Sequence, residues 1–196
     1  MQRMKVIVVA LLVVVLTMCN GVTVRASDFD KSDSTTSYSS DVDSDLIGAK
    51  LISENEYVKD GRRISEKIYE QTDGTIIVDT LSVRAKLPRS LNGSDTATRT
   101  RTISGWGSIT VSATFDWYTE GMFSYVRCRN MSANRSLVNG VAVSTWNTSY
   151  TSSYVSIGSA NAQVEYYFYN PSVLYEFKKG TFKITCTDGG SISDNG

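Results

Sequence analysis

The chain has 196 residues, about the length of one domain once a targeting segment and a flexible stretch are set aside. It contains no histidine, which excludes Ser-His-Asp and Cys-His catalytic sites, the HExxH zinc site and imidazole as a general base. Its 20 basic and 20 acidic residues are in balance, so it lacks the concentrated basic footprint of a nucleic-acid binder.

Residues 1–26 have the pattern of a secretory signal peptide. Arg3 and Lys5 form a positive start, and an almost unbroken apolar run of 14 residues follows from 6 to 19. A membrane-spanning helix needs about 20 such residues, so the run is too short to span. The Val-Arg-Ala triplet that ends at Ala26 suits signal peptidase. We therefore expect cleavage after Ala26, secretion of the mature protein and no membrane span afterwards.

Two other interpretations of this segment stay open. In the first interpretation, residues 1–26 are an uncleaved membrane anchor, although the short apolar core counts against that. In the second the protein is a lipoprotein anchored through Cys19, but Met18 stands where a lipobox needs a small residue.

Residues 27–46 form an acidic low-complexity segment, with six aspartates, seven serines and one lysine. It can bury too little apolar surface to offset the entropy of ordering it, so we expect a disordered tether. Asp41, Asp43 and Asp45 imitate the start of an EF-hand loop. Leu46 and Ile52 then stand where that loop needs Gly and Glu, so we expect no metal and no other cofactor.

Residues 47–86 have the pattern of a three-stranded β-meander. Asp60-Gly61 and Asp73-Gly74 are typical hairpin turns, because type I′ turns need positive φ at both central positions. They separate a strand around Tyr57 from strands at 64–72 and 75–85.

The following segment, 87–104, is rich in Ser, Thr, Asn and Gly and has the composition of a solvated linker. Arg89, Arg99 and Arg101 make it locally basic. This suggests an alternative function, in which cleavage here matures a secreted toxin or bacteriocin-like effector.

Residues 105–190 show the period-two alternation of strands that are buried on one face. The clearest runs lie at 108–118 and 160–168, and turn signals such as Asn139-Gly140 and Lys179-Gly180 separate shorter strands. Short strands with turns every ~8 to 12 residues predict an all-β fold and an antiparallel β-sandwich. The pattern is immunoglobulin-like only in a generic sense, since the Cys-Trp-Cys spacing is missing. We expect a flexible tail at 191–196.

Two cysteines remain after signal cleavage, and an even number in an oxidising compartment predicts a disulfide between Cys128 and Cys186. Cys128 is in phase with Val126, and Cys186 with Ile184, so both point to the expected interior. Two buried free thiols are the alternative.

Paired carboxylates are the catalytic option that remains without histidine. The candidates in the folded part are Glu66, Glu70, Asp79, Asp116, Glu120, Glu165 and Glu176. The sequence assigns no pair among them, so we expect a protein that is not an enzyme, with a carboxylate-pair glycan enzyme as the weakest alternative.

Aromatic residues carry the functional hypothesis, because exposed Tyr and Trp supply rigid contact area with a polar tip. Six lie on predicted polar faces or in loops: Tyr118, Trp146, Tyr150, Tyr154, Tyr167 and Tyr169. They predict a secreted, non-enzymatic module that binds an unknown protein or carbohydrate at the cell envelope or in the medium. The ordinary alternative is that tyrosine decorates the wet face of a sheet.

Overall fold

The computed structural model describes residues 46–85, 91–173 and 176–194. The expected signal peptide (1–26) and residues 27–45 of the expected tether lie outside these ranges. Within them no helix is long and apolar enough to cross a membrane. The strands of the described chain are β1 (Lys50–Lys59), β2 (Arg62–Glu70), β3 (Ile76–Arg84), β4 (Gly93–Ile103), β5 (Gly107–Glu120), β6 (Phe123–Leu137), β7 (Ala142–Tyr150), β8 (Val155–Ser156), β9 (Ser159–Tyr169), β10 (Phe177–Thr187) and β11 (Ile192–Ser193).

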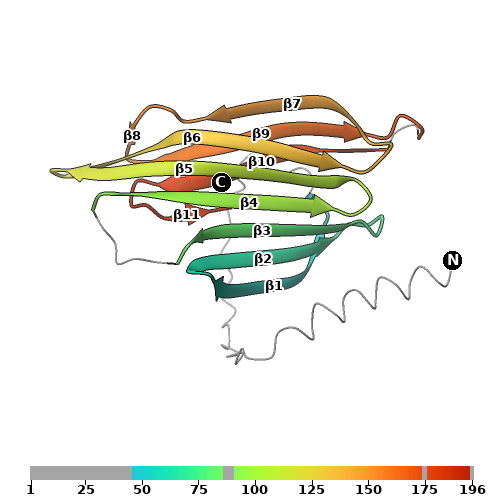
Figure 1. Cartoon of the computed structure of the whole chain (residues 1–196), viewed down its shortest axis with the longest axis horizontal. Coiled ribbons are helices and arrows are strands. Elements are labelled where there is room, and N and C mark those ends of the chain that lie inside the picture. Colours follow the sequence, from blue (N-terminus) through green and yellow to red (C-terminus); the bar gives the residue numbers. More distant parts are fainter. Residues whose placement is uncertain (1–45, 86–90, 174–175, 195–196) are drawn as a thin grey trace. The chain divides into compact units, whose positions relative to one another are not determined.

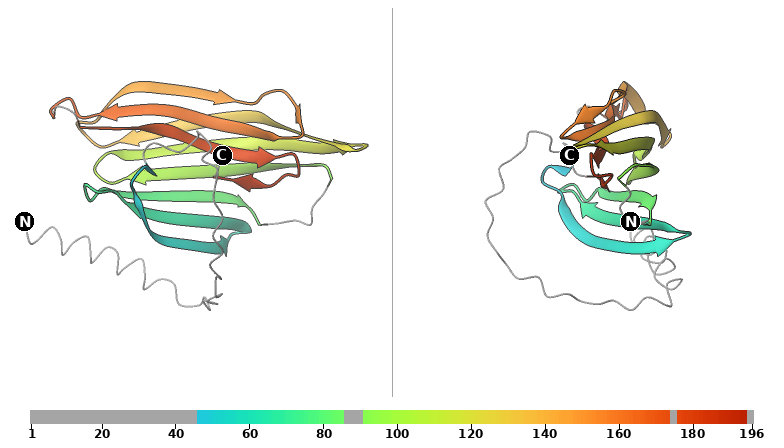
Figure 2. Two further views of the ribbon diagram at one scale, coloured as in Figure 1. Left: turned by 180° about the vertical axis from the view of Figure 1, so that it is seen from behind. Right: turned by 90° about the vertical axis from the view of Figure 1, so that its left-hand side faces the viewer.

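The described strands form two antiparallel sheets, which confirms the all-β prediction. Sheet A has the order β1-β2-β3-β4-β5-β6-β8, and sheet B has the order β11-β10-β9-β7. Figure 1 shows β1 to β6 following one another up the view. From behind, the strands of sheet B lie in front of the middle strands of sheet A, and β1 and β2 extend beyond them (Figure 2). The up-and-down order of β1 to β6 differs from the Greek-key connections of immunoglobulin domains.

The predicted meander is β1 to β3, and its first turn has the expected chemistry. Asp60 and Gly61 have φ values of 52° and 71°, the positive values that a type I′ turn needs at both central positions. Lys59 pairs with Arg62 directly across this turn. The local sequence therefore fixes the register of the hairpin.

One apolar core unites the inward faces of both sheets. Sheet A contributes buried residues such as Val111 and Phe115, and sheet B contributes Val164, Phe182 and Ile184. These are the apolar positions of the period-two runs, so the alternation predicted the buried faces of β5, β9 and the second half of β10.

Residues 93–103 form β4, and the prediction that they belong to a linker is wrong. β4 pairs with β3 on one side and with β5 on the other. Its inward positions include Arg99 and Arg101, both buried. A strand with one buried face is recognised by apolar residues at its inward positions. The two arginines interrupt that pattern, so the sequence did not indicate a strand here. The meander and the body are consequently parts of one sheet.

Two smaller predictions about the C-terminal strands are also wrong. β10 continues through Lys179-Gly180, where Gly180 is buried and pairs with Tyr166. Glycine inside a strand marks close approach of a neighbour as well as a turn, and the pattern does not separate the two. The expected tail contains β11, which pairs with the end of β10 and buries Ile192. A two-residue strand is too short to show a period.

Cys128 in β6 and Cys186 in β10 are buried, as their strand phase predicts, but both are free thiols, so the predicted disulfide is absent. They lie in different sheets, and each Sγ donates to a nearby backbone oxygen of its own strand, that of Asn130 at 3.2 Å and that of Thr187 at 3.5 Å. Burial raises the pKa of Cys128 to about 11 and that of Cys186 to about 12. Both therefore stay protonated and unreactive at neutral pH.

Candidate functional site

The six aromatic residues predicted as a binding surface do not form one surface. Trp146 and Tyr150 pair with the buried residues Tyr166 and Ala162, which places them on the inward face of β7. The Trp146 ring packs against the core and stacks on Phe168 with a centroid distance of 6.4 Å. Trp146 is thereby removed from an outer binding surface, and Tyr150, although exposed, lies away from the outer face that carries Tyr167 and Tyr169.

Tyr118 and Tyr154 lie together on the outer face of sheet A, with Tyr125 as a third ring. The Tyr118 and Tyr125 rings stack at 4.8 Å, and the Tyr154 ring meets Tyr118 edge-on at 4.9 Å. The Arg127 guanidinium covers the Tyr154 ring at 4.5 Å and also binds Asp116. These rings use much of their surface on one another, so the cluster holds β5, β6 and the segment before β8 together.

Tyr167 and Tyr169 lie on the outer face of sheet B, where they line an open groove of about 620 Å³. The backbone register brings Phe177 of β10 opposite Tyr169. The described residues that line the groove are Ser144, Tyr167, Tyr169, Asn170, Pro171, Val173, Glu176 and Phe177. We call this site the aromatic groove.

Three rings make up the aromatic side of the groove. Tyr167 stacks on Phe177 at 5.4 Å with an interplanar angle of 12°, and the centroids of Tyr167 and Tyr169 are 6.5 Å apart. The Lys179 Nζ lies 5.9 Å from the Phe177 ring centroid, on the same outer face. The paired strands β9 and β10 hold these rings, so the apolar surface is fixed before any ligand arrives.

The polar rim of the groove is tied together by hydrogen bonds across the β9–β10 connection. Asn170 Nδ2 donates to Glu176 Oε2 at 3.0 Å, and the Ser172 amide donates to Asn170 Oδ1 at 3.0 Å. The Asn170 amide also donates to the Glu176 carbonyl at 3.2 Å. Glu176 thus presents a carboxylate with a fixed neighbour, beside rings that are themselves fixed.

Phe177, Glu176 and Asn170 are groove residues that the aromatic hypothesis missed. The sequence did contain a signal for Phe177. Tyr167 and Tyr169 stand at alternate positions just before the Asn-Pro turn, so the first residues of the next strand are expected to pair beside them.

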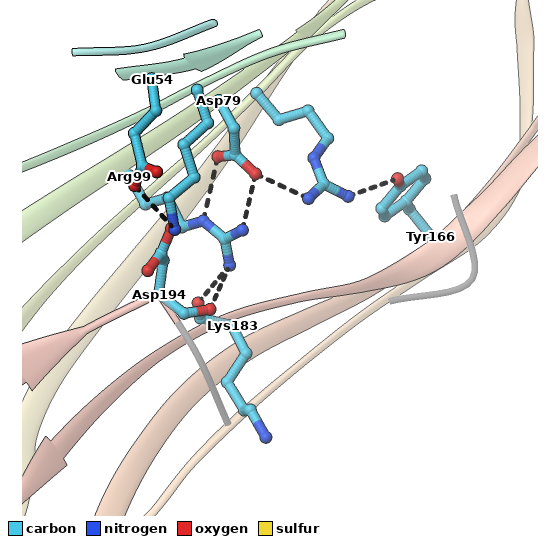
Figure 3. A network of polar contacts seen from close by, with 8 residues as sticks. Glu54, Asp79, Arg99, Tyr166, Lys183 and Asp194 are labelled. Atoms are coloured by element: carbon cyan, nitrogen blue, oxygen red, sulfur yellow. Dashed lines mark hydrogen bonds and ion pairs between the residues drawn. The ribbon is translucent and has the colours of Figure 1, made fainter. Parts of the chain in front are cut away.

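Asp79, one of the carboxylate candidates, is buried between two arginines (Figure 3). Arg99 donates from Nε to Oδ1 at 3.0 Å and from Nη2 to Oδ2 at 2.6 Å, while Arg101 Nη2 donates to Oδ2 at 2.7 Å. Burial alone would raise the pKa of Asp79, but Arg101 and Arg99 lower it below its ordinary value. The carboxylate therefore stays ionised and fully engaged.

The same cluster joins the two sheets. Arg99 Nη1 donates to the carbonyls of Lys183 at 2.6 Å and Asp194 at 3.2 Å. Both guanidinium groups also lie over the Phe182 ring, Arg99 at 4.3 Å and Arg101 at 4.9 Å. We therefore assign Asp79 a structural role.

The other carboxylate candidates lie apart from this cluster. Asp116 binds Arg127 and Arg129 on the outer face of sheet A, and Glu165 accepts from Asn147 on sheet B. Glu66 and Glu70 lie in β2, and Glu120 ends β5. Among the described residues no group of three His, Cys, Asp or Glu side chains could hold a metal ion. Comparison with protein-family models, curated proteins and solved structures finds no match to this chain.

Proposed function

We propose that the chain is a secreted β-sandwich module that binds a small uncharged carbohydrate in the aromatic groove and performs no chemistry on it. The observation that carries the proposal is the groove itself, where three aromatic rings face a fixed carboxylate and amide. Its volume of about 620 Å³ falls within the roughly 300–1,000 Å³ range of small-ligand sites.

The chemistry of a sugar ring suits this lining. One face of a pyranose carries C–H groups that pack on aromatic rings, while hydroxyls at its edge both donate and accept hydrogen bonds. Glu176 accepts, and Asn170 and Ser144 do both. Glu176 is the charged residue among the described lining residues, and Lys179, of opposite charge, lies beside Phe177 on the same face, so the site has no net charge that would select an ion.

The arrangement of the carboxylates near the groove supports the proposal of binding without catalysis. Hydrolysis of a glycosidic bond uses two carboxyl groups about 5 to 10 Å apart. Glu176 is the carboxylate among the described lining residues, and its Oε2 already accepts from Asn170. The export signal in the sequence supports action at the cell envelope or in the medium.

For the alternative of a processed effector, β4 counts against two of the three expected cleavage positions, Arg99 and Arg101, while Arg89 lies outside the described residues. Cleavage after Arg99 or Arg101 would cut a strand that is paired on both sides, and both side chains are buried. Proteases favour exposed loop tips over such positions.

A glycan array followed by calorimetry with the strongest neutral glycan tests the proposal. Tyr169→Ala and Tyr167→Ala should weaken binding at least tenfold, since each removes a stacking face. Tyr150→Ala is the matched control, because Tyr150 is exposed but lies outside the groove, and it should keep wild-type affinity. Equal affinity in all three variants, or a protein ligand that competes for the groove, would contradict a carbohydrate site.

A further inference from the structure

The outer face of sheet A carries a regular grid of short, uncharged polar side chains on three neighbouring strands. Cross-strand pairing sets four rows of three, in which β4, β5 and β6 contribute one residue each. The rows are Thr96–Thr114–Asn130, Thr98–Ser112–Ser132, Thr100–Thr110–Asn134 and Thr102–Ser108–Ser136. We call these twelve residues the hydroxyl face. All except Thr114 are exposed or half-buried.

Hydrogen bonds between β4 and β5 align this face. The hydroxyls of Thr96 and Thr114 are 2.8 Å apart, and those of Thr98 and Ser112 are 3.0 Å apart. A third pair, Thr100 and Thr110, is separated by 3.1 Å. Each of these six hydroxyls still has lone pairs for another partner, so the β4–β5 part of three rows is held in position yet able to bind.

The absence of charge on this face is selective. No Lys, Arg, Asp or Glu occupies any of the twelve positions, although charged residues are 20% of the chain. The outward positions of β2, in contrast, include Arg62, Glu66 and Glu70. Those of sheet B include Glu165 and Lys183. Outward charge on β5 and β6 lies beyond one end of the grid, at Asp116, Arg127 and Arg129, and the four grid rows themselves carry none.

We propose that the hydroxyl face is a second binding surface, which takes an uncharged polysaccharide chain. Serine, threonine and asparagine donate and accept in turn, as the hydroxyls of a glycan do. Nucleic acids and anionic membranes bind through Lys and Arg, and this face has neither. The neutrality of the face thus matches a neutral polymer.

The size of the face also favours a polymer chain over another protein surface. Strands about 4.8 Å apart and rows about 6.8 Å apart give the grid an area of roughly 400 Å². A stable protein–protein interface covers about 800 Å² on each partner, twice as much. A narrow chain several sugars long covers the grid without needing more.

This surface is independent of the aromatic groove. The two sheets share one core, so their outer faces point away from each other. The hydroxyl face and the groove therefore engage separate ligands or separate parts of a long one, and a failure at one site leaves the other intact.

Affinity electrophoresis of the secreted chain in gels containing hydroxyethyl cellulose, xyloglucan or mannan tests the proposal, with alginate as the anionic comparison. Retardation is expected in at least one neutral gel. Ser132→Lys and Thr96→Lys place a charge at two exposed grid positions and should reduce the affinity at least fivefold. The control Ser149→Lys adds the same charge on exposed β7 of sheet B and should migrate with unchanged affinity after correction for charge.

Several outcomes would overturn the inference. These are wild-type retardation in both grid variants, stronger binding to alginate, or a dimer in light scattering that Ser132→Lys dissociates. If Ser132→Lys retains the neutral polysaccharide while Tyr169→Ala loses its glycan, the hydroxyl face fails and the proposed groove function stands. If Ser132→Lys loses the polysaccharide while Tyr169→Ala keeps its glycan, the proposed groove function fails and the hydroxyl face stands.

Discussion

The two sides of β4 invert the usual arrangement of a surface strand. Its inward side carries Arg99 and Arg101, both buried, whereas its outward side carries the threonines of the hydroxyl face. The arginines are tolerated inside because Asp79 and backbone carbonyls satisfy them. Within β4, the charged side chains therefore lie on the inward side, where they join the sheets, and the outward threonines are uncharged.

This contrast shows that polarity alone does not report which side of a strand is buried. Long, planar guanidinium groups can lie inside when a carboxylate and an aromatic ring meet them. Short hydroxyls can fill an outer face when charge would interfere with a ligand. The predictions below act on the inner side first and then on the outer side.

Asp79→Asn should have the largest effect on stability. It leaves two buried arginines facing a neutral amide, and breaking such a pair costs about 3–5 kcal/mol. Urea unfolding should show a much lower midpoint. Glu56→Gln is the control, because its ion pair with Arg63 is exposed and should be worth less than about 1 kcal/mol. If Asp79→Asn and Glu56→Gln lower the free energy of unfolding by similar amounts, the buried cluster around Asp79 contributes no more to stability than an exposed ion pair.

Acid should weaken the protein by protonating two paired carboxylates, the buried Asp79 and the exposed turn residue Asp73. The pKa of Asp79 is lowered by its arginines, and hydrogen bonds from Thr75 and Lys178 lower the pKa of Asp73 to about 2. A depressed folded pKa gives stability that is present above the unfolded value near 4 and is lost as pH falls through the folded value. The thermal midpoint should fall between pH 4 and about 2. It should change little from pH 6 to 8, because no histidine titrates there. A drop near pH 6 would contradict this assignment.

A comparison of β4 with β5 and β9 shows which strands could be predicted from the sequence. Strands with apolar inward positions, such as β5 and β9, and turns such as Asp60-Gly61 were recognised from local pattern. β4 was missed because its inward partner Asp79 lies in another strand, and pairing between distant residues leaves no periodic signal. For the same reason Tyr167 and Tyr169 were predicted, but their neighbour Phe177 was not. The strand phase of Cys128 and Cys186 predicted that both are buried. A disulfide also requires the two Cα atoms to lie within about 4.4 to 6.8 Å, and strand phase carries no information on that distance.

On the outer side, Thr100→Val should cost little. It removes one cross-strand hydroxyl pair, with Thr110, and keeps the β-branched shape that suits a strand. Such pairs contribute about 0.2–1 kcal/mol, so the urea midpoint should shift slightly. A loss as large as that of Asp79→Asn would show that the hydroxyl rows hold the fold together and are not reserved for a ligand.

The smallest expected effect concerns the two inner thiols. Because Cys128 and Cys186 are free, a reducing agent should leave the thermal midpoint unchanged. Intact-mass analysis after alkylation in denaturant, without reduction, should show both thiols modified. Alkylation only after reduction, with a lower midpoint, would establish a disulfide instead.

A nuclear magnetic resonance titration of the isotope-labelled chain with a neutral oligosaccharide tests the central claim most directly, because it reports where the ligand lies. We predict amide shift changes on the two outer surfaces, around Tyr169 and Phe177 in the groove and along β4 to β6 on the hydroxyl face. The buried cluster around Asp79 should stay unshifted. Shift changes confined to other surfaces, or none with any neutral glycan, would contradict the account.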